Sequence, residues 1–187
     1  MLDHRATRPD DWRKALSLRP QSSDRIIARR AKIEILLVIH RLDSRNRRGR
    51  AFLITYQFRK HLHYGKLHDP NDASEKIDYH VFIARKDEMG IGALLVARPQ
   101  LGARLVRWTR TGHTLSKRQS RKQPVWKVAF VGVLSSRRRQ GIATALIEEA
   151  ALYLGVAIKD FGWMLPFEPD GEALARKLCP RFFWSAI

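Results

Sequence analysis

The stretch SSRRRQGIATALIEEAALYLG, residues 135–155, places three arginines and one glycine directly before an amphipathic helix that Gly155 would end. The first N–H groups of a helix lack partners within it and lie at the positive end of the helix dipole. Gly141 would let a ligand approach the backbone closely, because it has no side chain, and the arginines at 137–139 add positive charge. The stretch therefore predicts either an anion-binding site or an ordinary basic helix cap.

An apolar segment, VWKVAFVGVL at residues 125–134, runs directly into this helix and predicts a strand too apolar to face solvent. With a single glycine, the loop between them is neither a P-loop nor the dinucleotide-binding loop GxGxxG. Further upstream, the apolar runs YHVFIA and IGALLVA flank the charged turn RKDEMG, so residues 78–99 predict a β-hairpin.

The other segments predict a mixed order of strands and helices, and therefore an α/β protein. Residues 33–42 are apolar enough for either a buried strand or a buried helix. We expect a helix within residues 10–20, a helix in the segment 51–67 that ends at Gly65, and a helix at 169–179. We expect strands at 158–167 and 181–187.

The segment VGVLSSRRRQGIATALI, residues 131–147, resembles the acetyl-CoA-binding motif of the GNAT acyltransferases. That motif reads Arg or Gln, two residues, Gly, one residue, and Gly or Ala; Arg138, Gly141 and Ala143 occupy these places. The hairpin at 78–99 and the elements after residue 155 are similar to other parts of the family, so the resemblance covers about residues 78–187, with residues 1–77 matching loosely. It implies a GNAT fold, in which helices flank a mostly antiparallel central sheet that is splayed at the cofactor strand.

The resemblance also implies where acetyl-CoA, or another acyl-CoA, would bind. Backbone amides of the loop would hold the pyrophosphate, and a bulge at Val133 and Leu134 would pair with the pantetheine arm. The backbone N–H of Leu134 would polarise the thioester carbonyl. The cofactor-binding residues so implied are Val133, Leu134, Arg137, Arg138, Arg139, Gln140, Gly141, Ile142, Ala143 and Thr144.

Acyl transfer to an amine also needs a base for the amine and a proton for the leaving thiolate. Many family members place a tyrosine after the last helix as the acid, whereas this chain has KLCPRFFW there. Cys179 is the nearest titratable residue, and it would either supply the proton or pack in the core.

The base is open among Glu168, Asp170, His80 and His113. The segment PFEPDGEALARKL, residues 166–178, resembles the cohesin-acetylating branch of the family, which has Pro-Asp-Gly near the same point. Asp170 is therefore a candidate catalytic residue. The alternative is that Asp170 caps the helix beginning near Gly171.

With 187 residues, the chain is long enough for one domain, which we divide into a basic N-terminal part (1–77) and a core (78–187). Its single cysteine excludes an internal disulfide and a cysteine-based zinc site, and we expect no metal. No apolar run reaches the length of a membrane span, and the first residues lack the core of a secretion signal. We expect a cytoplasmic monomer or homodimer.

The net charge of +18 favours a polyanionic partner. Residues 98–127 carry nine basic and no acidic side chains, so an insertion at about 98–124 predicts either a nucleic-acid-binding surface or a solvated loop. Trp108 would stack on a base or anchor this segment to the core. The candidate nucleic-acid-binding residues are Arg104, Arg107, Trp108, Arg110, Lys117, Arg118, Arg121 and Lys122.

These observations predict an acetyl-CoA-dependent N-acyltransferase whose acceptor is associated with nucleic acid, tRNA or DNA. The acceptor would be an aminoacyl-tRNA, a nucleobase or a nucleic-acid-bound protein. Two alternatives stay open: a GNAT fold that has lost catalysis and binds nucleic acid, and a protein-lysine acetyltransferase whose basic regions bind an acidic protein.

Overall fold

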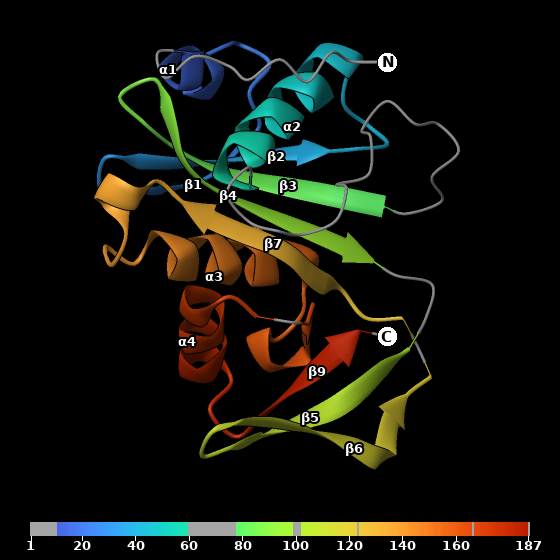
Figure 1. The fold of residues 1–187 in the computed structure, drawn as a ribbon. Coiled ribbons are helices and arrows are strands. Elements are labelled where there is room, and N and C mark those ends of the chain that lie inside the picture. The colour runs from blue at the N-terminus through green and yellow to red at the C-terminus, as the bar shows by residue number, and fades with distance from the viewer. Residues whose placement is uncertain (1–10, 60–77, 99–101, 123, 166, 187) are drawn as a thin grey trace.

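The computed structural model describes residues 11–59, 78–98, 102–122, 124–165 and 167–186. They form one nine-stranded sheet in the order β1-β2-β3-β4-β7-β8-β9-β5-β6 (Figure 1). Only the β7–β8 and β8–β9 pairs are parallel, so the sheet is mostly antiparallel, as predicted. The strands are β1 Ile26–Arg30, β2 Ile33–Ile39, β3 Asp78–Lys86, β4 Met89–Arg98, β5 Ala103–Thr109, β6 Gly112–Arg121, β7 Lys127–Val133, β8 Gly162–Trp163 and β9 Phe182–Ala186.

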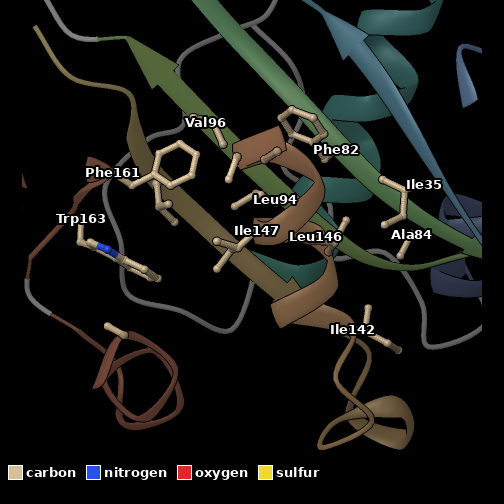
Figure 2. Close-up of a cluster of buried hydrophobic side chains, with 14 of the residues drawn as sticks. Ile35, Phe82, Ala84, Leu94, Val96, Ile142, Leu146, Ile147, Phe161 and Trp163 are labelled. Atoms are coloured by element: carbon tan, nitrogen blue, oxygen red, sulfur yellow. The ribbon is translucent and has the colours of Figure 1, made fainter. Parts of the chain in front are cut away.

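Helices cover both faces of this sheet (Figure 1). On one face α1 and α2 pack against side chains such as Leu36 and Ile83. On the other face α3 and α4 cover a larger core, in which Leu146 and Ile147 of α3 lie against the sheet (Figure 2). The helices are α1 Asp11–Leu16, α2 Arg45–Arg59, α3 Ile142–Leu154 and α4 Pro169–Leu178, with short 3-10 turns η1 Ser135–Arg137 and η2 Ile158–Asp160.

The apolar segment at 33–42 contains the strand β2, which settles the choice between strand and helix. Alternate residues of β2 point into the two cores: Ile35 and Leu37 contact the α3 side, and Leu36 and Val38 the α2 side. A strand covered on both faces needs apolar residues at successive positions, so its sequence shows no alternation. This double burial explains why periodicity alone could not identify it.

The predicted hairpin at 78–99 is confirmed as β3–β4. Asp87 and Glu88 form its two-residue turn with φ of 49° and 59°, the left-handed values that suit tight hairpins. The predicted helix at 51–67 begins earlier, at Arg45, because the Ser44 hydroxyl accepts a hydrogen bond from the Arg47 N–H at 3.5 Å. Its predicted end at Gly65 lies outside the described residues.

A solvated loop, one of the two interpretations of residues 98–124, is wrong. The segment forms β5 and β6, and β5 pairs along its length with β9 near the end of the chain. Within β5 the apolar Leu105 and Val106 are buried, while Arg104 and Arg107 are exposed. The arginines lower the mean hydropathy of the segment, so its sequence does not indicate a strand. The partner of that strand, β9, lies about 80 residues later in the chain.

Candidate functional site

The sheet opens beside β7. On one side β7 pairs with β4 from Lys127 to Val133, whereas on the other side it pairs with β8 only at Lys127 and Val128. Beyond Val128 the two strands separate, and Figure 1 shows β7 and β9 running in strongly different directions. The predicted splay at this strand is therefore present, and it leaves the C-terminal half of β7 with a strand partner on one side only.

The backbone of β7 determines which groups face this opening. The N–H of Leu134 donates to the carbonyl of Ile91 on β4 at 2.9 Å. Hydrogen-bonded pairs alternate along an antiparallel ladder, so Gly132 also faces β4, while the N–H and C=O of Val131 and Val133 point into the splay.

The assignment of a polarising N–H to Leu134 is therefore wrong, because that N–H already has a partner within the sheet. The predicted bulge is also misplaced: the irregularity lies at Ala129, where the partners of Leu95 and Val96 are Phe130 and Val128. An extra residue at 129 shifts the alternation by one, so the backbone groups of Val131 and Val133, and not those of Leu134, point into the splay. Nothing local in the sequence reveals this shift.

The loop from β7 to α3, residues 135–141, is called the arginine loop below. Arg139 and Gly141 have φ of 62° and 78°, so the chain turns through two left-handed residues before α3 begins. A Cβ added at Gly141 would meet no atom within 4 Å, so this backbone is open to a ligand. The first hydrogen bond of α3 runs from Ala145 to Gly141 at 2.9 Å, which leaves the N–H groups of residues 142–144 without partners in the helix.

This geometry fits the pyrophosphate of an acyl-CoA. Unpaired N–H groups at Ile142, Ala143 and Thr144, an accessible glycine and three arginines lie at the end of a strand whose edge is open. Gln140 bonds to the Ser136 carbonyl at 3.5 Å, and Arg137 lies in the η1 turn, so both belong to the same loop. Arg138 also donates to the Val133 carbonyl at 3.5 Å.

Asp170 does not cap α4. Glu168 occupies the N-cap position without a side-chain hydrogen bond, and Asp170 lies in the first turn. Its carboxylate instead pairs with Arg139 at 2.9 Å and with Arg138 at 3.3 Å. The structure thus joins two sequence-predicted site segments, 32 residues apart, that no local pattern connects.

Cys179 is buried at the end of α4, and its thiol approaches the Ile158 carbonyl at 3.8 Å. Burial raises the pKa of this thiol above its ordinary value, with a smaller opposing effect from the Trp163 indole. These surroundings favour the packing interpretation over a role in proton donation.

The other base candidates lie on separate elements. His80 is buried on β3, with its ring 4.9 Å from that of Trp126, and His113 lies exposed on β6. Glu168 is exposed and forms no ion pair among the described residues. Asp170 is the candidate that contacts the arginine loop.

The sequence did not point to Val131, whose backbone groups face the splay, or to Lys127 at the start of β7. Lys127 begins β7 opposite Gly162 of β8, at the point where the splay starts. Burial lowers the pKa of its ammonium group. The signal that could have drawn attention to Lys127 is its position as the single lysine inside the apolar segment at 125–134.

The basic hairpin, β5 with β6, forms one edge of the sheet. Trp108 points inward: its indole N–H donates to the Cys179 carbonyl at 2.7 Å, and the Arg176 guanidinium lies 4.3 Å from its ring centre. The anchor interpretation of Trp108 is therefore favoured over base stacking. Arg121 lies over the Trp184 ring and pairs with Asp160. The backbone of Lys117 and Arg118 lies at the irregularity in the pairing of β6 with β5. The other candidate basic residues of this segment are exposed: Arg104, Arg107, Arg110 and Lys122.

No protein-family model matches the chain, and no curated protein matches it in sequence. Its structure is similar to that of the xEco2 acetyltransferase domain, with a TM-score of 0.71 and 15% identity over 90% of this chain and 98% of that chain. The chain has the GNAT fold. The same domain bound to a K105-CoA conjugate gives a TM-score of 0.72, again at 15% identity, over 89% and 98% of the two chains.

The GNAT fold extends beyond the region of sequence resemblance. Because the structural match covers 90% of the chain, it continues from residues 78–187 into the N-terminal part, where β1 and β2 join the same sheet. None of the helices in the described ranges is long and apolar enough to cross a membrane. In the same ranges no three His, Cys, Asp or Glu side chains are grouped so that they could hold a metal ion.

Proposed function

We propose that the chain is an acyl-CoA-dependent N-acyltransferase, with acetyl-CoA as the expected donor. The observation that carries this proposal is the open edge of β7, which ends directly in the arginine loop. Such an edge suits the amide groups of a pantetheine arm, and the start of α3 suits a pyrophosphate. The CoA conjugate bound by a domain of the same fold gives further support.

In this proposal, Val133 and residues 137–144 hold the cofactor, and the N–H of Val131 polarises the thioester carbonyl. Acyl-CoA supplies an activated thioester: the amine nitrogen bonds to the carbonyl carbon, the C–S bond breaks, and the thiolate takes up a proton. The chain contributes mainly by orienting the two substrates and by the backbone donor at Val131. Asp170 is the proposed acceptor of the amine proton.

Within the described ranges, the segment KLCPRFFW after the last helix offers no tyrosine as a proton donor for the thiolate. The Cys179 thiol in this segment is buried. We propose that water at the open side of the splay supplies it.

The acceptor is proposed to be associated with nucleic acid: an aminoacyl-tRNA, a nucleobase or a nucleic-acid-bound protein. Support comes from the net charge of +18 and from exposed Arg104, Arg107, Arg110 and Lys122 on the basic hairpin. These side chains can contact phosphates, and they would repel a cationic acceptor such as a polyamine. Affinity for nucleic acid that barely changes with salt would instead favour an acidic protein partner and lysine acetylation.

A catalytically inactive GNAT fold that binds nucleic acid is the second candidate, favoured by the absence of the tyrosine. Measurable turnover of acetyl-CoA with any amine acceptor would exclude it. Saturable binding of acetyl-CoA without turnover across tRNA, DNA and peptide acceptors would favour it.

The test of cofactor binding is calorimetric titration of nucleic-acid-free protein with acetyl-CoA. Gly141→Glu should weaken binding by more than a hundredfold, because a carboxylate would occupy the open space beside the pyrophosphate. Gly141→Ala is the matched control. Both variants place a side chain at a left-handed φ of 78°, but only Gly141→Glu adds a negative charge and a long side chain. Unchanged affinity in a folded Gly141→Glu protein would remove the cofactor assignment.

A further inference from the structure

Both carboxylate oxygens of Asp170 are engaged by the arginine loop. Oδ1 accepts from Arg139 at 2.9 Å and Oδ2 from Arg138 at 3.3 Å, so one residue of α4 bridges two neighbouring guanidinium groups. These are two of the three arginines proposed to meet the cofactor pyrophosphate. The Asp170 carboxylate thus binds the guanidinium groups that a phosphate of the cofactor would bind.

Arg138 makes a second contact that acyl-CoA would have to replace. Its Nε lies 3.5 Å from the Val133 carbonyl, one of the groups that point into the splay. The side chain therefore reaches from Asp170 across the open edge of β7. A pantetheine arm pairing with that edge and Arg138 in this position would compete for the same carbonyl.

We propose that Asp170 is a placeholder for the cofactor pyrophosphate. In the unloaded protein it pairs with both Arg138 and Arg139 and holds Arg138 across the splay; acyl-CoA binding draws both arginines to the phosphates and releases the carboxylate. Only the loaded protein then offers a free Asp170 carboxylate to an acceptor amine. This inference rests on the proposed function.

The contacts are weak enough to be displaced. Asp170, Arg138 and Arg139 are 56%, 58% and 79% exposed, and exposed ion pairs contribute little in water. A pyrophosphate carries more charge and more acceptor oxygens than a carboxylate, so it wins the competition for guanidinium groups. The placeholder lowers cofactor affinity by roughly two- to tenfold and does not prevent binding.

Release of Asp170 leaves α4 in place. Ala175 is fully buried in the core, and Arg176 donates to the Gly112 carbonyl at 2.8 Å while it lies over Trp108. These contacts hold the C-terminal half of the helix, so Asp170→Asn should fold. The substitution removes the charge and keeps the shape of the side chain.

The test measures the affinity of acetyl-CoA for the full chain at low salt by calorimetry. Asp170→Asn should bind about two- to tenfold more tightly than the wild type, and the gain should shrink as salt screens the ion pairs. Glu168→Gln is the matched control, because it removes the same charge two residues away without touching the loop arginines; its affinity should stay close to that of the wild type. Equal or weaker binding by Asp170→Asn, or an equal gain in Glu168→Gln, would overturn the placeholder.

This result is separable from the proposed function. If neither the wild type nor either variant binds acetyl-CoA, the cofactor assignment itself fails. If the wild type binds and Asp170→Asn gains nothing, only the placeholder fails.

A second measurement on the unaltered protein uses the Nε–H NMR signals of Arg138 and Arg139, assigned with single Arg→Lys variants. Both signals should shift when acetyl-CoA is added, and in the unloaded protein both should shift on Asp170→Asn substitution. Signals that ignore the Asp170 substitution, or that stay unchanged at saturating acetyl-CoA, would contradict the exchange of partners.

Discussion

The arginine loop and the basic hairpin are both rich in arginine, yet they place it in different surroundings. Two of the three loop arginines converge on one carboxylate beside open backbone N–H groups. The hairpin arginines Arg104, Arg107 and Arg110 are exposed and lie on or between the two outermost strands. Convergent charge suits one small anion, whereas dispersed charge suits an extended polyanion.

Charge on the edge strands of the sheet has a different role from charge on β5. β6 is an edge strand of the sheet, and at the opposite edge β1 carries Arg29 and Arg30. Charged side chains on edge strands discourage pairing with other chains. Arg104 and Arg107 lie on β5, between β9 and the edge strand β6, so edge protection does not account for their exposure.

The largest expected effect comes from neutralising the hairpin as Arg104→Gln, Arg107→Gln, Arg110→Gln and Lys122→Gln together. For each of these four side chains that contacts a phosphate, the variant should lose roughly tenfold in nucleic-acid affinity at 0.1 M salt. The slope of log affinity against log salt should flatten by about 0.9 for each such contact. Acetyl-CoA affinity should not change. Salt-dependent titrations with tRNA and duplex DNA measure this, and unchanged affinity in a folded variant would remove the hairpin as a nucleic-acid-binding surface.

The reciprocal substitution is Arg138→Gln with Arg139→Gln. Acetyl-CoA affinity should fall by about ten- to a hundredfold, because the variant removes two charge-assisted hydrogen bonds to phosphate. Nucleic-acid affinity should change by less than in the hairpin variant. If both variants weakened both ligands equally, the two regions would form one surface and the contrast would be false.

A smaller effect is expected where the two regions are connected. Arg176 of α4 donates to the Gly112 carbonyl at the hairpin turn, pairs with Glu172 and covers the Trp108 ring. Arg176→Met keeps the apolar stem and should lower the free energy of unfolding by about 1–2 kcal/mol, since it removes a hydrogen bond and a cation–π interaction. Hydrogen exchange should rise at the β5–β6 turn and stay unchanged in α3; uniform exchange would show that Arg176 does not connect them.

The sequence was most informative where its signals are local. The helix at 142–154, its glycine stop at Gly155 and the turn at Asp87 and Glu88 all follow from residues within a few positions of one another. These elements were predicted close to their observed bounds. The arginine loop was predicted for the same reason.

What the sequence missed depends on contacts between distant residues. The strand β5 is stabilised by β9, and Asp170 meets Arg138 across 32 residues, so neither has a local signature. The error at Leu134 has another cause: an extra residue at Ala129 reverses which backbone groups face the splay. Side-chain patterns do not report the direction of backbone N–H groups beyond a bulge.

The smallest expected effect concerns Cys179, which has a buried thiol and a backbone carbonyl that accepts a hydrogen bond from the Trp108 indole. Burial raises its pKa, so the folded state keeps the proton above the ordinary thiol value of about 8.5. This contribution to stability is complete below that pH and is lost as pH rises through the higher folded pKa. Urea unfolding at pH 7 and pH 10 should therefore show a larger loss of stability in the wild type than in Cys179→Ala. Equal losses in the two proteins would mean that folding does not raise the pKa of this thiol, and the packing interpretation of Cys179 would lose that support.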